Sequence, residues 1–315
     1  MIETRNLTKV YGDKVAVDDM TFTVPAGTVT GFLGPNGAGK STTMRLILGL
    51  DRPTKGTALI DGRRYEDFPA PLHEVGAMLE ARSIHPGRSA EAHLIALAKT
   101  HRIPRRRVTE LIELVGLEEV ARERAGTFSL GMGQRLGIAA ALLGDPATVI
   151  LDEPANGLDP EGIRWIRNLL KNLAAEGRTV FLSSHLMAEM AQTAERLVVV
   201  GRGRLIAEAT VEDLVDKASL DGSVLVRSPR APELGEALAG PGVSITVEAP
   251  DVLQIRGHSP GRIGDIAADR GIAVHELTPN RVSLEEAFMS LTQDAVEFST
   301  GREEPAVGAG QEVPA

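Results

Sequence analysis

Short apolar runs and stretches of helical periodicity follow one another through the first part of the chain. Alternating apolar and polar positions predict paired strands at residues 2–10 and 16–24. The continuous apolar run at 29–33 predicts a short buried strand, and residues 41–50 predict a helix directly after it. A further short strand is predicted at 56–62. The beginning of the chain therefore combines strands with a helix that starts at a glycine-rich loop.

The middle of the chain is predicted to be mainly helical before strands return. Apolar residues recur at helical spacing between about residues 89 and 143, with Ser89 as a candidate cap and Pro104 in the first turn of a second helix. Strands that alternate with helices favour a largely parallel sheet covered by helices. The remaining predicted elements are strands at 148–151, 178–183 and 197–200 and helices at 160–176 and 186–195.

After about residue 220 the pattern changes, which predicts a separate small α+β domain at 221–296. From residue 297 to residue 315 the chain is rich in Gly, Glu and Pro, so this tail is predicted to be disordered. The predicted elements of the small domain are strands at 223–226, 243–247, 252–255 and 272–277 and helices near 231–238, 261–269 and 284–291.

Composition and charge limit the function classes. The 315 residues contain no cysteine, which leaves neither disulfides nor thiolate metal sites and suits a reducing cytosol. No apolar run approaches the ~20 residues that span a bilayer, and the N-terminus lacks a signal-peptide pattern. A net charge of −9 argues against nucleic acid or anionic lipid as a partner. The basic cluster at 102–107 is interpreted as a solvated helix start, and any membrane contact is expected through a separate protein.

One glycine-rich segment carries the strongest chemical signal. Residues 34–41 read GPNGAGKS, which fits the phosphate-binding pattern G-x-x-x-x-G-K-S/T between a strand and a helix. Backbone N–H groups of such a loop turn toward a phosphate, Lys40 reaches the β- and γ-phosphates, and the Ser41 hydroxyl binds Mg²⁺. The flanking elements disfavour the alternative, a glycine-rich turn that binds nothing. The other predicted nucleotide-binding residues here are Gly34, Asn36, Gly37, Gly39 and Thr42.

Two consecutive carboxylates provide the second half of an ATP site. The apolar strand at 148–151 leads directly into Asp152 and Glu153. An Asp in this position holds the Mg²⁺ shell, and the adjacent Glu polarises the water that attacks the γ-phosphate. Paired carboxylates also occur in ordinary turns, but their place after a buried strand downstream of the phosphate loop favours hydrolysis.

With three further segments, the chain resembles the nucleotide-binding subunit of ABC transporters over residues 1 to about 217. Residues 128–136 read FSLGMGQRL where this family carries its LSGGQ-type signature. Residues 156–159 read NGLD at the D-loop position, and His185 follows Ser184 at the switch-histidine position. Tyr11 matches the aromatic residue that stacks on adenine. Taken alone, His185 and Tyr11 are equally compatible with structural roles.

The resemblance implies an α/β fold of the P-loop NTPase class. Its ABC-type nucleotide-binding domain, residues 1–220, has a mixed-sheet core and a helical subdomain at about 81–143. The resemblance also implies a composite site, in which ATP on Lys40 and Ser41 of one subunit meets Ser129 and Gly131 of a second copy. His185 is expected to sense the γ-phosphate, and Asp159 to shape the dimer seam. The expected assembly is a homodimer on a separate ABC-2-type permease at the cytoplasmic face of the cell membrane.

Two departures from the family pattern bear on turnover. Leu130 and Met132 replace a glycine and a glutamine of the signature, whereas Ser129 and Gly131 keep the polar groups expected to meet the γ-phosphate. Glu80 stands where most relatives have the glutamine of the Q-loop. A carboxylate is a ready Mg²⁺ ligand, so Glu80 is predicted to link the metal to the permease-facing helical region.

These variants resemble the drug and peptide-antibiotic export branch, which includes daunorubicin-, bacitracin- and lantibiotic-type exporters. The chain is therefore interpreted as the ATP-hydrolysing subunit of such an exporter, with residues 221–296 as a regulatory or dimer-stabilising accessory. Two alternatives remain: an ATP-binding regulatory or immunity subunit with weak hydrolysis, and an ABC ATPase that acts on ribosomes or DNA. A single phosphate loop, the absence of long coiled coils and the acidic net charge disfavour the latter.

Overall fold

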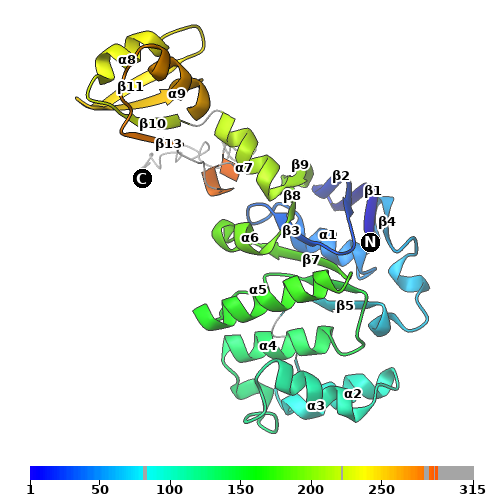
Figure 1. Ribbon diagram of the computed structural model, residues 1–315. Coiled ribbons are helices and arrows are strands. Elements are labelled where there is room, and N and C mark those ends of the chain that lie inside the picture. The colour runs from blue at the N-terminus through cyan, green and yellow to red at the C-terminus, as the bar shows by residue number, and fades with distance from the viewer. Residues whose placement is uncertain (81–83, 221–222, 280–283, 287, 290–315) are drawn as a thin grey trace, which may run out of the picture.

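Two sheets form the N-terminal part of the protein in the computed structural model, which describes residues 1–80, 84–220, 223–279, 284–286 and 288–289 (Figure 1). The smaller sheet is antiparallel, in the order β2-β1-β4. The larger sheet has the order β5-β6-β7-β3-β8-β9, with only β9 antiparallel to its neighbour. The strands are β1 (Ile2–Tyr11), β2 (Lys14–Val24), β3 (Val29–Leu33), β4 (Lys55–Ile60), β5 (Val75–Met78), β6 (Thr148–Leu151), β7 (Thr179–Ser184), β8 (Arg196–Gly201) and β9 (Arg204–Thr210).

The predicted fold class is confirmed, and two strands of the large sheet were not predicted. β5 has only four residues, including a glycine and an alanine that favour no strand. β9 contains two alanines and a glutamate and is only partly buried. Both strands owe their conformation to pairing with β6 and β8, respectively.

Helices cover the large sheet and extend beyond it. Ser89 caps its helix as predicted, since its hydroxyl accepts a hydrogen bond from Ala92 N–H at 3.2 Å. Pro104, by contrast, occupies the N-cap position, one residue before the first turn. The helices of this part are α1 (Lys40–Ile47), α2 (Ala90–Thr100), α3 (Arg105–Leu114), α4 (Leu130–Ala141), α5 (Pro160–Ala175) and α6 (Met187–Thr193), with 3₁₀ turns at Tyr65–Asp67, Pro71–His73 and Ala125–Thr127.

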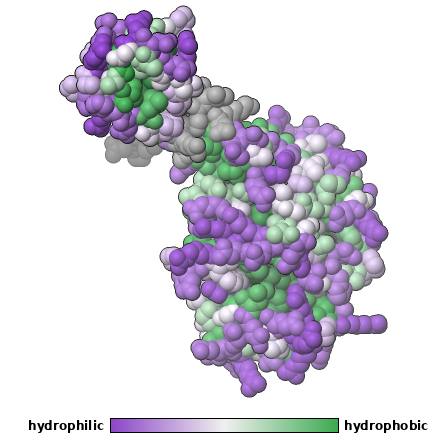
Figure 2. Space-filling view, viewed as in Figure 1, coloured by the Kyte–Doolittle hydropathy of each residue, from purple (hydrophilic) through white to green (hydrophobic). Residues whose placement is uncertain are grey.

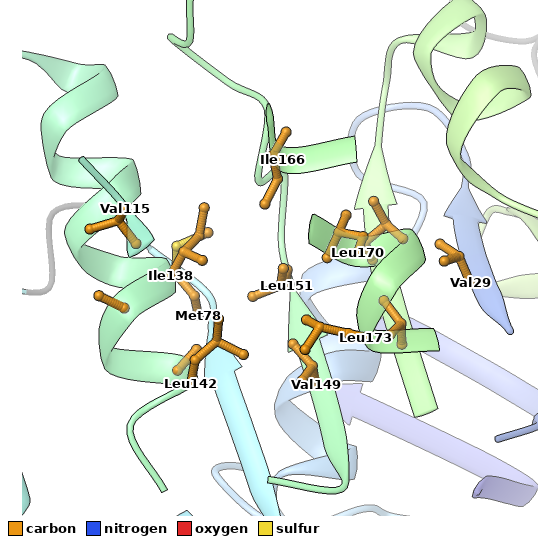
Figure 3. Packing of buried hydrophobic residues seen from close by; sticks show 14 of the residues in the cluster. Val29, Met78, Val115, Ile138, Leu142, Val149, Leu151, Ile166, Leu170 and Leu173 are labelled. Atoms are coloured by element: carbon orange, nitrogen blue, oxygen red, sulfur yellow. The ribbon is translucent and has the colours of Figure 1, made fainter. Parts of the chain in front are cut away.

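The large sheet is buried on both faces, which explains its continuous apolar strands. Val149 and Leu151 of β6 join a cluster that includes Ile166 and Leu170 of α5, as Figure 3 shows. Ile150, between them, joins a second cluster with Phe22, Phe32 and Phe181. The rings of Phe32 and Phe181 lie 5.1 Å apart between their centroids. Neighbouring side chains of one strand therefore fill two different cores.

The C-terminal part forms an antiparallel sheet in the order β11-β12-β10-β13. With its two helices the sheet follows the ferredoxin-like βαββαβ order. It has a hydrophobic cluster of its own, which includes Val226, Leu234 and Ile255. The elements of this part are β10 (Ser223–Arg227), α8 (Ala231–Leu238), β11 (Ser244–Ala249), β12 (Val252–Arg256), α9 (Pro260–Asp269) and β13 (Glu276–Pro279). The preceding helix, α7 (Val211–Leu220), follows β9, and its Leu214 packs into a cluster of the N-terminal part.

The final predicted strand and helix agree with the structure only in part. β13 begins at Glu276, whereas Ile272 packs into the cluster from the loop before it. Of the helix predicted at 284–291, residues 284–286 and 288–289 are helical and the others lie outside the described residues. The predicted disordered tail, 297–315, also lies outside them, and the predicted domain limits remain predictions.

Polar side chains dominate the face of the molecule drawn in Figure 2, with smaller apolar areas between them. Among the described helices, none combines the length and the apolar character that crossing a membrane requires.

Candidate functional site

The glycine-rich loop between β3 and α1 borders a cavity of about 290 Å³. Opposite the loop, Asp152 and Glu153 follow β6 and complete the wall together with Lys14 and Ala16 of β2. The structure thus joins the two predicted halves of an ATP site, and it adds two β2 residues that carry no motif. The predicted residues that line the cavity are Asn36, Gly37, Gly39, Lys40, Ser41 and Thr42.

Two glycines shape the loop. Gly39, the residue before α1, has a φ of 98°, and a Cβ atom there would lie 2.5 Å from the Ala16 carbonyl oxygen. Gly37 has a φ of 80° and no described atom within 4 Å of such a Cβ position. Both conformations favour glycine, and they leave the loop open toward the cavity.

Lys40 begins α1 and is buried. Its ammonium group donates hydrogen bonds to the carbonyl oxygens of Gly34 at 2.6 Å and Pro35 at 3.3 Å. Burial lowers the pKa of Lys40, while the carboxylates of Glu153 and Asp152 act in the opposite direction. The lysine charge therefore lies inside the loop, held by backbone groups and facing the two carboxylates.

Asp152 connects α1 with the neighbouring strand β7. The Ser41 hydroxyl donates to Asp152 Oδ2 at 2.7 Å, and the Ser183 hydroxyl donates to Asp152 Oδ1. Asp152 N–H donates to the Met78 carbonyl of β5 at 2.8 Å, which holds the residue at the sheet edge. Ser41 and Asp152 thus place two oxygen ligands side by side, the donor type that Mg²⁺ prefers.

Glu153 is held by a residue of β7, by a residue of α4 and by the histidine just after β7. It has a φ of 50°, a rare conformation for a non-glycine residue, and its N–H donates to Ser183 Oγ at 2.9 Å. The Gln134 side-chain amide donates to the Glu153 carbonyl at 2.8 Å. His185 Nδ1 lies 2.8 Å from Glu153 Oε2, and His185 N–H donates to the same oxygen at 3.3 Å. Two of the predicted catalytic residues are therefore in direct contact.

Two residues that hold Glu153, namely Ser183 and Gln134, have no predicted role. Gln134 lies inside the signature-like segment, and this position is the only feature of the sequence that links Gln134 to the ATP site. Ser183 is a buried residue of β7 directly before Ser184 and His185, and only strand pairing brings it to Asp152 and Glu153.

The signature-like segment lies outside the phosphate-loop cavity. Ser129 caps α4, with its hydroxyl accepting a hydrogen bond from Met132 N–H at 3.2 Å. Ser129 and Leu130 border a different cavity, of about 410 Å³. A Cβ atom at Gly131 would lie 2.9 Å from the Gly157 carbonyl oxygen, so this segment packs closely on the NGLD turn. A single chain therefore does not bring Ser129 and Gly131 to the phosphate loop.

Asp159 and Tyr11 have local partners. Asp159 caps α5, where its Oδ1 accepts a hydrogen bond from Gly162 N–H at 2.8 Å. Tyr11 is 46 % exposed, its hydroxyl donates to Asp51 at 3.0 Å, and Lys9 Nζ lies 4.8 Å from its ring centroid. Desolvation and the bond to Asp51 raise the pKa of Tyr11. Their predicted roles at the dimer seam and on adenine remain predictions.

Glu80 follows β5 and borders a third cavity, of about 440 Å³, together with Arg45 and His93. The structure does not bring Glu80 into the cavity of Ser41 and Asp152, and its role as a metal ligand remains a prediction. Residues 81–83, which follow it, lie outside the described residues. Within the described ranges, no three His, Cys, Asp or Glu side chains form a metal cluster.

Comparisons with known proteins identify the family of the chain. A profile described as ABC transporter matches residues 17–156, and one described as a domain of unknown function matches 222–285. The chain is 34 % identical to the bacitracin transport ATP-binding protein BcrA of Bacillus licheniformis, with 92 % of this chain and 97 % of the relative covered. It is 34 % identical to the lantibiotic transport ATP-binding protein SrtF of Streptococcus pyogenes, with 66 % and 90 % covered.

A solved structure supports the same fold. The dimeric ATP-binding cassette MJ0796, in a post-hydrolysis state bound to ADP and Pi, matches with a TM-score of 0.62 and 27 % identity. The match covers 67 % of this chain and 98 % of that structure. The similarity therefore applies to the part of the chain that holds the phosphate loop and the paired carboxylates.

Proposed function

Because the chain belongs to the ATP-binding subunits of ABC transporters, we propose that its ATP hydrolysis powers export of a drug-like or peptide antibiotic through a separate transmembrane permease. The observation that carries this proposal is the arrangement around the phosphate loop. Ser41 and Asp152 are in contact on one side of the cavity, and Glu153 and His185 are in contact beside it. These pairs provide the metal-binding and water-activating groups that phosphoryl transfer to water requires.

The residues fit ATP and Mg²⁺. The open loop at Gly37 leaves room for phosphate, and Lys40 supplies a buried positive charge. Ser41 and Asp152 would hold Mg²⁺, whose remaining ligands are phosphate oxygens and water in sites of this kind. When bound, the ion neutralises negative charge on the phosphates.

Each residue then has a defined task in hydrolysis. Lys40 orients the γ-phosphate, and Glu153 accepts a hydrogen bond and then a proton from the attacking water. The water oxygen forms a bond to phosphorus while the bond to the β-phosphate oxygen breaks, which yields ADP and phosphate. His185 donates a hydrogen bond to the γ-phosphate, and Ser183 and Gln134 hold the backbone of Glu153 in its unusual conformation.

A second copy of the chain completes the site in this proposal. Ser129 is exposed at the border of its own cavity and Gly131 is only partly buried, so both are available to the nucleotide on a partner. The dimeric form of the related cassette supports a pair of chains, for which we propose a head-to-tail arrangement. The γ-phosphate attracts both halves, and its removal lets them separate.

The names of the relatives support the proposed substrate class. Bacitracin and lantibiotic transport appear in their names, which supports a peptide antibiotic as the substrate class here. The partner is an ABC-2-type permease, and the protein is expected at the cytoplasmic face of the cell membrane through that contact alone. No nucleic acid is expected as a partner, in keeping with the net charge of −9.

The test is coexpression with an ABC-2-type permease from the same genome in a host sensitive to peptide antibiotics. We expect higher resistance and permease-stimulated ATP hydrolysis, both lost in Glu153→Gln. ATP binding without hydrolysis in the wild-type complex would instead identify a regulatory or immunity subunit, which the replacement of a signature glycine by Leu130 favours as the second candidate. Purification with ribosomes rather than membranes would contradict both.

A further inference from the structure

A small cavity lies between α5 and α6, behind the proposed hydrolytic residues. Its volume is about 20 Å³, and Arg167 of α5 and Glu189 of α6 line it from opposite helices. Pro154 and Ala155, which follow Glu153, and Ser184, which precedes His185, also border it. The cavity therefore touches both segments that carry the hydrolytic pair.

Two polar atoms in this region are buried without a hydrogen-bond partner. They are Nε of Arg167, a donor, and Oε2 of Glu189, an acceptor. Burying either group without a partner costs roughly 1–3 kcal/mol, so such atoms normally bond to protein or to ordered water. The described residues contain no direct salt bridge between Arg167 and Glu189. The space suffices for one water molecule, which needs about 10–15 Å³.

The charges around Glu189 connect it to the same pair. Burial raises the pKa of Glu189, Arg167 of α5 and His185 after β7 act against this, and Glu153 after β6 raises it further. Glu189 also follows His185 by four residues, with the start of α6 between them. Its carboxylate is therefore within electrostatic reach of both members of the pair.

We propose that Arg167 and Glu189 are positioning residues that share one bound water and hold α6 against the segment after Glu153, so that His185 stays in contact with Glu153. The proposal rests on the roles proposed above for Glu153 and His185. Neither Arg167 nor Glu189 touches the nucleotide, and both act through the position of the pair. The ligand of the site is a single water, which bridges a guanidinium and a carboxylate.

The test measures MgATP hydrolysis by the full-length chain in the variants Glu189→Gln, Arg167→Met and the double variant. Glu189→Gln keeps the shape of the side chain and removes its charge. We expect kcat to fall about ten-fold, as for coupled residues in one network, and ATP affinity to stay within about two-fold. The kcat of the double variant should be no lower than that of the less active single variant. Glu195→Gln, which changes an exposed carboxylate just after α6, is the matched control.

A pH profile separates positioning from a merely structural role. Removing the negative charge of Glu189 disfavours protonation of groups near it, so the acid limb of the kcat profile should move to lower pH. Wild-type kcat and an unmoved limb in Glu189→Gln would overturn the proposal. So would a double variant whose loss equals the product of the single losses. A third outcome is that the variants lose thermal stability and ATP affinity together while the acid limb of the kcat profile stays in place. This outcome would assign Arg167 and Glu189 a purely structural role and would also overturn the proposal.

Two further measurements keep the outcome clear. If Glu189→Gln does not fold, Glu189→Asp replaces it, and a lower kcat with an unmoved acid limb is then expected because the charge remains. Unchanged kcat in that variant would overturn the proposal. Glu153→Gln is measured in the same series. If it is inactive, the proposed hydrolysis is supported. A wild-type kcat in Glu189→Gln then contradicts only the positioning role of Glu189.

Discussion

His185 Nδ1 lies 2.8 Å from Glu153 Oε2, and His185 N–H donates to the same oxygen at 3.3 Å. One carboxylate oxygen of the proposed general base is therefore already occupied by histidine. The other carries no hydrogen bond among the described residues and is free to accept one from water. The contact orients the carboxylate through two groups of one residue, which suits a base that must point in one direction.

Glu153→Gln is expected to bind ATP with nearly wild-type affinity and to lower kcat by roughly 10²–10³-fold. An amide keeps the shape of the side chain but accepts no proton from the attacking water. Equilibrium ATP binding and phosphate release measure the two effects separately. Scattering in saturating MgATP should report a dimer of this variant, since the γ-phosphate is retained. Wild-type turnover would exclude Glu153 as the base.

Lys40→Ala is expected to weaken ATP binding by about 100-fold or more, because it removes a buried charge that meets the phosphates. It also leaves the carbonyl oxygens of Gly34 and Pro35 without their lysine donor. Titration with a fluorescent ATP analogue measures the affinity. Lys171→Ala, an exposed lysine of α5, is the control and should bind like wild type. Unchanged affinity in Lys40→Ala would refute the phosphate-loop assignment.

Ser183→Ala is expected to lower both stability and kcat. The hydroxyl donates to Asp152 and accepts from Glu153 N–H, so its removal leaves a backbone donor without its partner, at a cost of roughly 1–3 kcal/mol. Denaturant unfolding and steady-state hydrolysis measure the two effects. Thr30→Val, in neighbouring β3, is the matched control, because Thr30 Oγ1 is buried without a hydrogen-bond partner. That change should be neutral or stabilising, and an equal loss in both variants would contradict a specific role of Ser183.

Gly157→Ala is expected to disturb the contact between the signature-like segment and the NGLD turn. Gly157 has a φ of 76°, and a Cβ atom there would lie 2.4 Å from Leu130 Cδ2. Strain from the φ value and the clash together should cost about 2 kcal/mol and reduce ATP hydrolysis. Adding Leu130→Ala removes the clash and should restore part of both, leaving the φ strain. No recovery in the double variant would mean that Leu130 does not restrict this turn.

His93 is expected to make the folded state less stable in acid. Burial first, and Arg88 second, lower the pKa of His93 from its ordinary value of 6.5. The unfolded chain therefore binds a proton that the folded chain resists, so stability is complete above about pH 6.5 and falls as the pH decreases below it. Urea unfolding at several pH values measures this trend. His93→Leu should show a smaller decrease between pH 7 and pH 5, and an identical decrease would assign the acid sensitivity to other groups.

Local patterns were sufficient for the phosphate loop, the paired carboxylates and most strands and helices. The loop is contiguous. Its glycines set the backbone conformation, and its lysine and serine supply side-chain groups within the same eight residues, so the sequence contains the whole motif. The apolar runs of β3, β6 and β7 were equally clear, because strands buried on both faces need no polar alternation.

Long-range pairing decided the rest of the site. Ser41 and Asp152 are 111 residues apart in the chain, and Ser183 and Gln134 carry no signal that points to Glu153. Their contacts exist because the parallel strands β6 and β7 end side by side and because α4, which packs against β5, brings Gln134 to Glu153. The sequence alone therefore determined which chemical groups the protein has and the order in which they occur. Only the tertiary structure determined which of them meet, since hydrogen bonds across a sheet depend on strand order, which no local pattern encodes.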